Sequence, residues 1–116
     1  MKYINKRDEV EEFGVTVMDF KLLIAVELSS SDKLVFQYLC SCRKGFNPSY
    51  KEISEALGIS AKTVIICIKN LEKNNLLSVA KQKEADSNKY MKNKYSLNHS
   101  SKWKCTYSNF DVEQLV

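Results

Sequence analysis

The lysine side chains of this sequence are numerous and closely spaced enough to bind a ligand. Between positions 60 and 104 there are ten lysines and three acidic residues, a net charge of +7. Residues 1–59 carry a net charge of −1, and residues 105–116 carry −2. Clustered ammonium groups attract phosphate, so this asymmetry indicates an anionic partner such as nucleic acid. A solvated lysine-rich surface is the alternative.

Cysteine and histidine could in principle carry redox, metal or nucleophilic chemistry. The four cysteines, Cys40, Cys42, Cys67 and Cys105, have no regular disulfide spacing, and the first two are too close for the C-x2-C pair of a zinc site. The single histidine, His99, has no acidic or nucleophilic neighbour at a motif spacing, and the three glycines are isolated. We therefore expect reduced thiols, no metal or other cofactor, and no enzymatic activity.

Length and hydropathy bound the class of protein. The 116 residues fit one domain, and 44% hydrophobic with 28% charged residues is typical of a globular chain with one modest core. The longest apolar run, residues 22–26, is too short to cross a bilayer, and the N-terminus lacks the apolar stretch of a signal peptide. We expect a cytoplasmic protein that does not contact membranes.

Start and stop signals predict three helices. The first is expected over residues 31–44, capped by Ser30 or Ser31 and ended by Gly45, with an apolar face formed by Leu34, Val35, Tyr38, Leu39 and Cys42. The second is expected over residues 50–57, because Ser49 and Glu52 form a capping box and Gly58 ends the stripe of Ile53, Ala56 and Leu57.

The third helix is expected over residues 61–74, capped by Ser60, with Val64, Cys67, Ile68 and Leu71 on its buried face. Asn74 and Asn75 can end it, because Asn tolerates the left-handed conformation. Residues 76–80 and 95–97 then predict a β-hairpin whose long tip, residues 81–94, is rich in lysine. Residues 15–28 are apolar without a clear period, so helix and strand both remain open there; this segment packs on the domain or on a second copy.

Residues 47–79, NPSYKEISEALGISAKTVIICIKNLEKNNLLSV, resemble the winged helix-turn-helix. With LSSSDKLVFQYL before FNPSYKEIS, the chain is similar to winged-helix domains in replication initiators and related proteins of phages and plasmids from low-GC Gram-positive bacteria. The resemblance covers about residues 28–98. It implies an α+β fold with a three-helix core plus a β-hairpin wing, and binding to double-stranded DNA.

The resemblance implies that the third helix enters the major groove. Ser60 and Thr63 would then hold a phosphate, Asn70 could read adenine, and the wing would grip flanking phosphates. The predicted DNA-binding residues are Ser49, Tyr50, Ser60, Lys62, Thr63, Ile66, Lys69, Asn70, Lys73, Lys81, Lys83, Lys89, Lys92 and Lys94. Among these, Lys62, Lys69, Asn70 and Lys73 are expected on the outward side of the third helix.

Two isoleucines leave a second class of function open. Ile65 can reach the flank of the core, whereas Ile66 lies on the face with the lysines. Ile66 could contact a thymine methyl group, join a protein interface, or be simply exposed. The rival to DNA binding is therefore a protein–protein interaction module that uses Ile65, Ile66 and the apolar tail.

We predict three regions: an N-terminal arm and packing segment, residues 1–29; the winged helix-turn-helix domain, residues 30–98; and a C-terminal tail, residues 99–116. The tail contains three large aromatic residues that are expected to be buried: Trp103, Tyr107 and Phe110. They could pack against the domain, form a dimer contact or belong to a further domain. The predicted function is double-stranded DNA binding in replication initiation or transcriptional regulation of a phage or plasmid. A homodimer and a replication or repressor protein are possible further partners.

Overall fold

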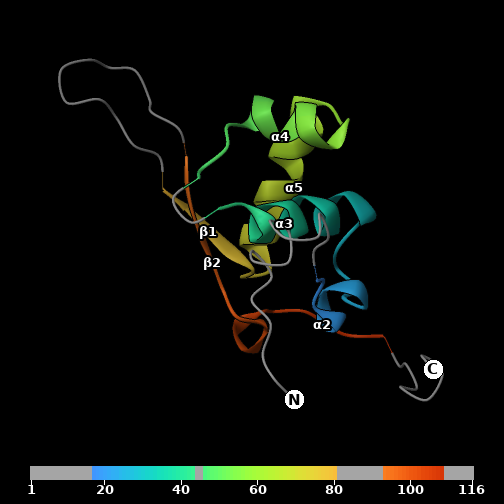
Figure 1. Ribbon diagram of the computed structural model, residues 1–116. Coiled ribbons are helices and arrows are strands. Elements are labelled where there is room, and N and C mark those ends of the chain that lie inside the picture. Colours follow the sequence, from blue (N-terminus) through green and yellow to red (C-terminus); the bar gives the residue numbers. More distant parts are fainter. Residues whose placement is uncertain (1–16, 44–45, 81–92, 109–116) are drawn as a thin grey trace.

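The computed structural model describes residues 17–43, 46–80 and 93–108. In chain order the elements are α2 (Phe20–Leu23), α3 (Ser30–Ser41), α4 (Tyr50–Leu57), α5 (Ala61–Lys73), β1 (Leu77–Ala80), β2 (Lys94–Leu97) and the short 3-10 helix η1 (Ser100–Lys102) (Figure 1). Helices α3, α4 and α5 pack together, and the antiparallel strands β1 and β2 follow them beside α3 and α5. This order confirms the predicted α+β fold, a winged helix-turn-helix.

Helix α3 begins at Ser30, one residue before its predicted start, and its cap is Ser29. The Ser29 hydroxyl accepts a hydrogen bond from the Asp32 amide (3.1 Å), and the Asp32 carboxylate accepts one from the Ser29 amide (2.8 Å). The prediction of Ser30 or Ser31 as the cap was wrong, because a reciprocal capping box needs a spacing of three residues and only Ser29 has that spacing from Asp32. The helix ends at Ser41, before the predicted end at residue 44; Gly45 lies outside the described residues.

The other helix boundaries follow local signals. Ser49 and Glu52 form the predicted capping box of α4, and Gly58 ends that helix in the left-handed region with φ of 69°. Ser60 caps α5 by accepting a hydrogen bond from the Thr63 amide (3.1 Å). Helix α5 ends at Lys73, and Asn75 then adopts φ of 64°, which Asn tolerates better than most side chains.

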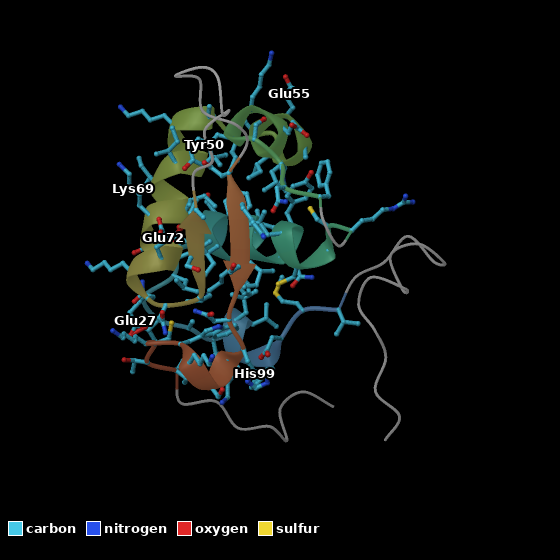
Figure 2. The ribbon with its side chains drawn as sticks, turned by 90° about the vertical axis from the view of Figure 1, so that its left-hand side faces the viewer. Glu27, Tyr50, Glu55, Lys69, Glu72 and His99 are labelled. Carbon is cyan, nitrogen blue, oxygen red and sulfur yellow. The ribbon has the colours of Figure 1, made fainter. Side chains whose placement is uncertain are left out.

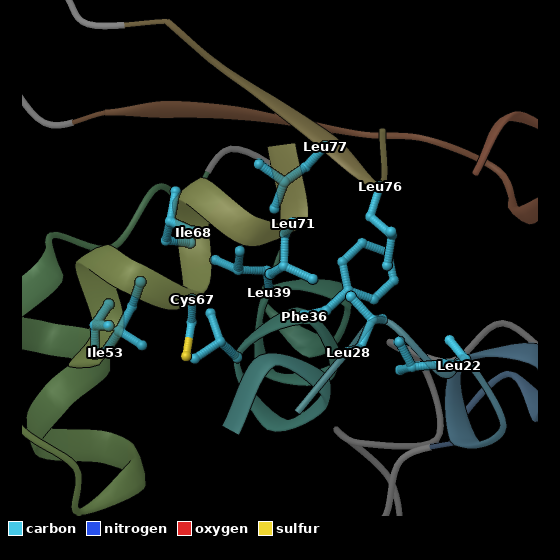
Figure 3. Packing of buried hydrophobic residues seen from close by; sticks show 13 residues of the cluster. Leu22, Leu28, Phe36, Leu39, Ile53, Cys67, Ile68, Leu71, Leu76 and Leu77 are labelled. Atoms are coloured by element: carbon cyan, nitrogen blue, oxygen red, sulfur yellow. The ribbon is translucent and has the colours of Figure 1, made fainter. Parts of the chain in front are cut away.

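One hydrophobic core holds the three helices and the sheet together. The four residues predicted for the buried face of α5 are all buried. Figure 3 shows Ile53 of α4 at one end of this cluster and Leu22 of α2 at the other, with Leu39 and Phe36 of α3 between them. The predicted faces of the other helices were wrong at two positions. Leu34 is 48% exposed and Phe36 is buried instead, and Ala56 of α4 is exposed.

The segments on either side of the three-helix unit pack against it and against each other. Leu22, Ala25 and Leu28 are buried in the core. The Val26 amide donates to the Thr106 carbonyl (2.9 Å), and the Ser108 amide donates to the Ile24 carbonyl (3.0 Å). Residues 17–28 are thus neither a long helix nor a paired strand, but a single helical turn followed by this short bridge to the later segment.

Trp103 anchors the later segment. Its ring meets Phe36 edge to face, with centroids 5.4 Å apart, and its Nε1–H donates to the Asn98 carbonyl (2.9 Å). Trp103 and Tyr107 both pack against the core of the domain, which is one of the three arrangements considered for the aromatic residues of the tail. Tyr107 is half-buried. Phe110 lies outside the described residues. In the described part of the chain, no helix has the length and apolar character needed to cross a membrane.

Candidate nucleic-acid interface

Helix α5 presents one continuous exposed face. Lys62, Ile66, Lys69 and Lys73 are all exposed, and a turn of about 100° per residue places them within about 60° of one another around the helix axis. We call these four residues the exposed arc. It lies opposite the buried face of the same helix. Figure 2 shows Lys69 projecting from α5 away from the body of the domain.

Asn70 does not belong to the exposed arc. It is half-buried, and its Nδ2 donates to Asp32 Oδ2 (2.6 Å) and to the Glu27 carbonyl (3.3 Å). Asn74 in turn donates from its own Nδ2 to the Asn70 carbonyl (2.9 Å). The prediction that Asn70 lies on the outward side of the helix was wrong. Its amide faces α3, because the nearly buried Asp32 carboxylate requires hydrogen-bond donors.

Asp32 is therefore a junction between α3 and α5. Besides the Ser29 and Asn70 donors, it lies close enough to Cys67 to affect that thiol. Burial, together with the hydrogen bond to Asp32 and the charge of Asp32, raises the pKa of Cys67 to about 12. Cys67 thus stays protonated at neutral pH and acts as a packed donor, not as a nucleophile.

The hydroxyl groups predicted to hold a phosphate already have roles in capping. Ser60 Oγ lies 2.8 Å from Thr63 Oγ1 and accepts from the Thr63 amide. Ser49 Oγ accepts from the Glu52 amide (3.1 Å). Ser60 is exposed, and Thr63 and Ser49 are half-buried. A phosphate contact at either helix start would add to these caps, and it stays a prediction.

The base of the wing is fixed beside the start of α4. The Tyr95 amide of β2 donates to Asn47 Oδ1 (3.3 Å), and Tyr50 and Tyr95 both pack partly against the core. Burial raises the pKa of Tyr95, with a smaller contribution from Tyr50. Lys94 is exposed and pairs with Ala80 in the strand register. The remaining predicted wing lysines, Lys81, Lys83, Lys89 and Lys92, lie outside the described residues.

The backbones of two further lysines, in the later segment, contact the residues that follow α5. The Lys102 carbonyl accepts from Asn75 Nδ2 (2.8 Å), and the Lys104 amide donates to the Asn74 carbonyl (2.8 Å). Both lysine side chains are exposed. Sequence reasoning missed them as site residues because the resemblance ends near residue 98. Positive charge near the C-terminal end of a helix is stabilising, so these two lysines can also contribute to the stability of α5.

Acidic side chains lie to the side of the exposed arc. Glu72 of α5 is exposed, but it is rotated about 90° from the centre of the arc. Glu27 accepts hydrogen bonds from the Thr106 amide at 2.7 and 2.8 Å, and these contacts with Thr106 lower the pKa of Glu27. The arc itself therefore holds three positive charges and no negative charge.

Residues 26–77 match the sequence model of a family described as "Helix-turn-helix domain". The match includes α3, α4 and α5 and ends as β1 begins. Among curated proteins and solved structures, none is significantly similar to this chain. The family match and the observed order of elements agree on a helix-turn-helix fold, and such a domain supports DNA as the partner.

Proposed function

We propose that this protein binds double-stranded DNA with α5 in the major groove. The observation that carries the proposal is the exposed arc of α5, which holds Lys62, Lys69 and Lys73 without an acidic residue. The major groove admits an α-helix, and lysines on the helix can reach the phosphates on both sides of it. Duplex DNA offers about one negative charge per 1.7 Å of its axis, so several exposed lysines can be neutralised together.

Further lysines would extend this contact beyond α5. Lys94 lies at the base of the wing, and Lys102 and Lys104 lie next to the end of α5. We propose that these residues, with the lysines of residues 81–92, bind phosphates beside the groove. Ser49, Tyr50, Ser60 and Thr63 would supply backbone contacts at the starts of α4 and α5.

The biological process is proposed from the resemblance of residues 28–98 to winged-helix domains of replication initiators. We propose a role in replication initiation or in transcriptional regulation of a phage or plasmid. One module of this size covers a short DNA site, so a homodimer on two half-sites is part of the proposal. Sedimentation at high protein concentration tests it, and a monomer would contradict the dimer while leaving DNA binding by one module intact.

Salt dependence is the sharpest test of the DNA-binding surface. Each phosphate contact contributes about 0.9 to the slope of log affinity against log salt concentration. The double variant Lys69→Ala with Lys73→Ala should reduce the slope by about 1.8 on duplexes of any sequence. The matched control is Lys21→Ala with Lys33→Ala, which removes the same charge from α2 and α3 and should leave the slope nearly unchanged.

Two results would overturn the proposal. Equal slopes for the two double variants would mean that the α5 lysines do not contact phosphate. Failure of the wild-type chain to shift any duplex at low salt would exclude DNA binding altogether. The rival interaction module, which would use the exposed Ile66 with Ile65, would then be the better explanation.

A further inference from the structure

Ile66 is the apolar member of an otherwise cationic surface. It is 58% exposed, and it lies on the exposed arc between Lys62, one turn before it, and Lys69, one turn after it. Binding of a partner that removes this isoleucine from water lowers the free energy, because burial of apolar surface is favourable. A partner for this surface must accommodate one isolated hydrocarbon group among ammonium groups.

The surroundings of Ile66 do not fit the core of a protein–protein interface. The buried centre of such an interface is depleted of lysine and other charged residues. The other large hydrophobic residues that are exposed in the described part of the chain come from outside α5: Val17, Leu23, Val26, Leu34 and Phe46. Ile65 is half-buried on the flank of α5, so no second exposed hydrophobic residue accompanies Ile66 on the arc.

The major groove of DNA offers the complementary arrangement. Its apolar group is the 5-methyl of thymine, which stands alone among polar base edges, and the groove is bordered by phosphates on both sides. A helix that places lysines toward the phosphates and one hydrocarbon side chain toward the floor of the groove matches this pattern in charge and in polarity.

Asn70, the polar residue predicted from the sequence to recognise a base, is not available on this face. Asn70 lies only about 40° from Ile66 around the helix axis. Its amide hydrogens are nevertheless donated to Asp32 and to the Glu27 carbonyl, so the amide is turned toward α3 and away from the exposed arc. Base discrimination through the exposed arc must therefore come from Ile66 and from its lysine neighbours.

We infer that Ile66 contacts the 5-methyl group of a thymine and so selects an A·T base pair at one position of the target. The inference rests on the proposed binding of α5 in the major groove, and it adds the residue and the base that determine specificity.

The experiment removes the methyl group alone. Target duplexes are first selected from random sequences with the full chain, and each thymine is then replaced in turn by deoxyuridine, which lacks only the 5-methyl. At one thymine the wild-type chain should lose about 4-fold in affinity, which corresponds to about 0.8 kcal/mol for a buried methyl group. Ile66→Ala should bind the selected duplex more weakly and show no difference between thymine and deoxyuridine at that position.

Two controls separate contact from general damage. Ile65→Ala, on the flank, should keep the thymine preference once its folding is verified by circular dichroism. Ile66→Val keeps a branched hydrocarbon and should retain part of the preference. The inference is overturned if no thymine is sensitive, if selection gives no sequence preference, or if Ile66→Ala discriminates as the wild type does. Loss of all duplex binding at low salt is a different result, because it would also overturn the proposed function.

Discussion

Replacing Asn70 by alanine tests whether this residue positions α5 or reads a base. In the structure the Asn70 amide donates to the nearly buried Asp32 carboxylate at 2.6 Å. The variant leaves that carboxylate without one of its donors. We expect lower stability of the domain and an unchanged order of preference among DNA sequences, measured well below the melting temperature.

The magnitude follows from three contributions. A hydrogen bond to a charged group contributes about 1.5–3 kcal/mol, and the 3.3 Å contact to the Glu27 carbonyl adds little. Alanine has a higher helix propensity than asparagine, which returns up to about 0.7 kcal/mol. The expected net loss is therefore about 1–2 kcal/mol in the free energy of unfolding, or a decrease in Tm of about 4–8 °C for a domain of this size.

Thermal and urea unfolding monitored by circular dichroism measure this loss. Lys69→Ala is the matched control, because it changes the neighbouring exposed position and should alter stability by less than about 0.5 kcal/mol. Asn70→Asp places a second carboxylate beside Asp32, so it should be less stable than Asn70→Ala at neutral pH and recover toward it in acid. If Asn70→Ala kept wild-type stability and lost its base preference, Asn70 would be a base reader and the positioning role would be wrong.

Three further predictions concern Cys67 in α5 and two contacts of the flanking segments, Glu27 with Thr106 and Trp103 with Asn98. Cys67 should be the last cysteine alkylated by iodoacetamide at pH 8, because a pKa of about 12 leaves about one thiolate in 10,000; mass spectrometry showing equal labelling of all four cysteines would contradict its burial. Hydrogen bonds from Thr106 lower the pKa of Glu27, so their stabilising effect is present above the ordinary value of 4.5 and is lost as the pH falls below it. Glu27→Gln should therefore be less stable than wild type at pH 7 and converge with it in acid, and parallel stability curves would refute this. Trp103→Phe should lose the hydrogen bond to Asn98 at a cost of about 1 kcal/mol, and Trp103→Ala should lose about 3 kcal/mol; denaturant midpoints unchanged in both would show that the later segment does not support the core.

Features that depend on neighbours in the sequence could be predicted. The Ser49–Glu52 capping box, the left-handed Gly58 and the 3.6-residue period of α5 all act within one or two turns, and the structure has each of them as expected. The cap of α3 was misplaced because three consecutive serines are nearly equivalent until the spacing to Asp32 is taken into account.

Features that depend on distant residues could not be predicted in this way. Asn70 and Asp32 are 38 positions apart, and the helical period alone leaves Asn70 on the polar side of α5. The bridge between Val26 and Thr106 joins segments with no recognisable pattern, so nothing in either segment identifies the other. Lys102 and Lys104 were kept out of the predicted site because the resemblance ends near residue 98, and their contacts with Asn75 and Asn74 also join distant parts of the chain.

The separation of roles around α5 affects how its targets could diverge. The four side chains of the exposed arc take no part in the hydrophobic core, so exchange at these positions could change the DNA sequence that the proposed interface prefers without disturbing the scaffold. Asp32 and Asn70 are constrained differently, because a change in either leaves the other unmatched. Homologues that prefer different DNA sequences should therefore vary independently at the arc and show correlated substitution at this pair.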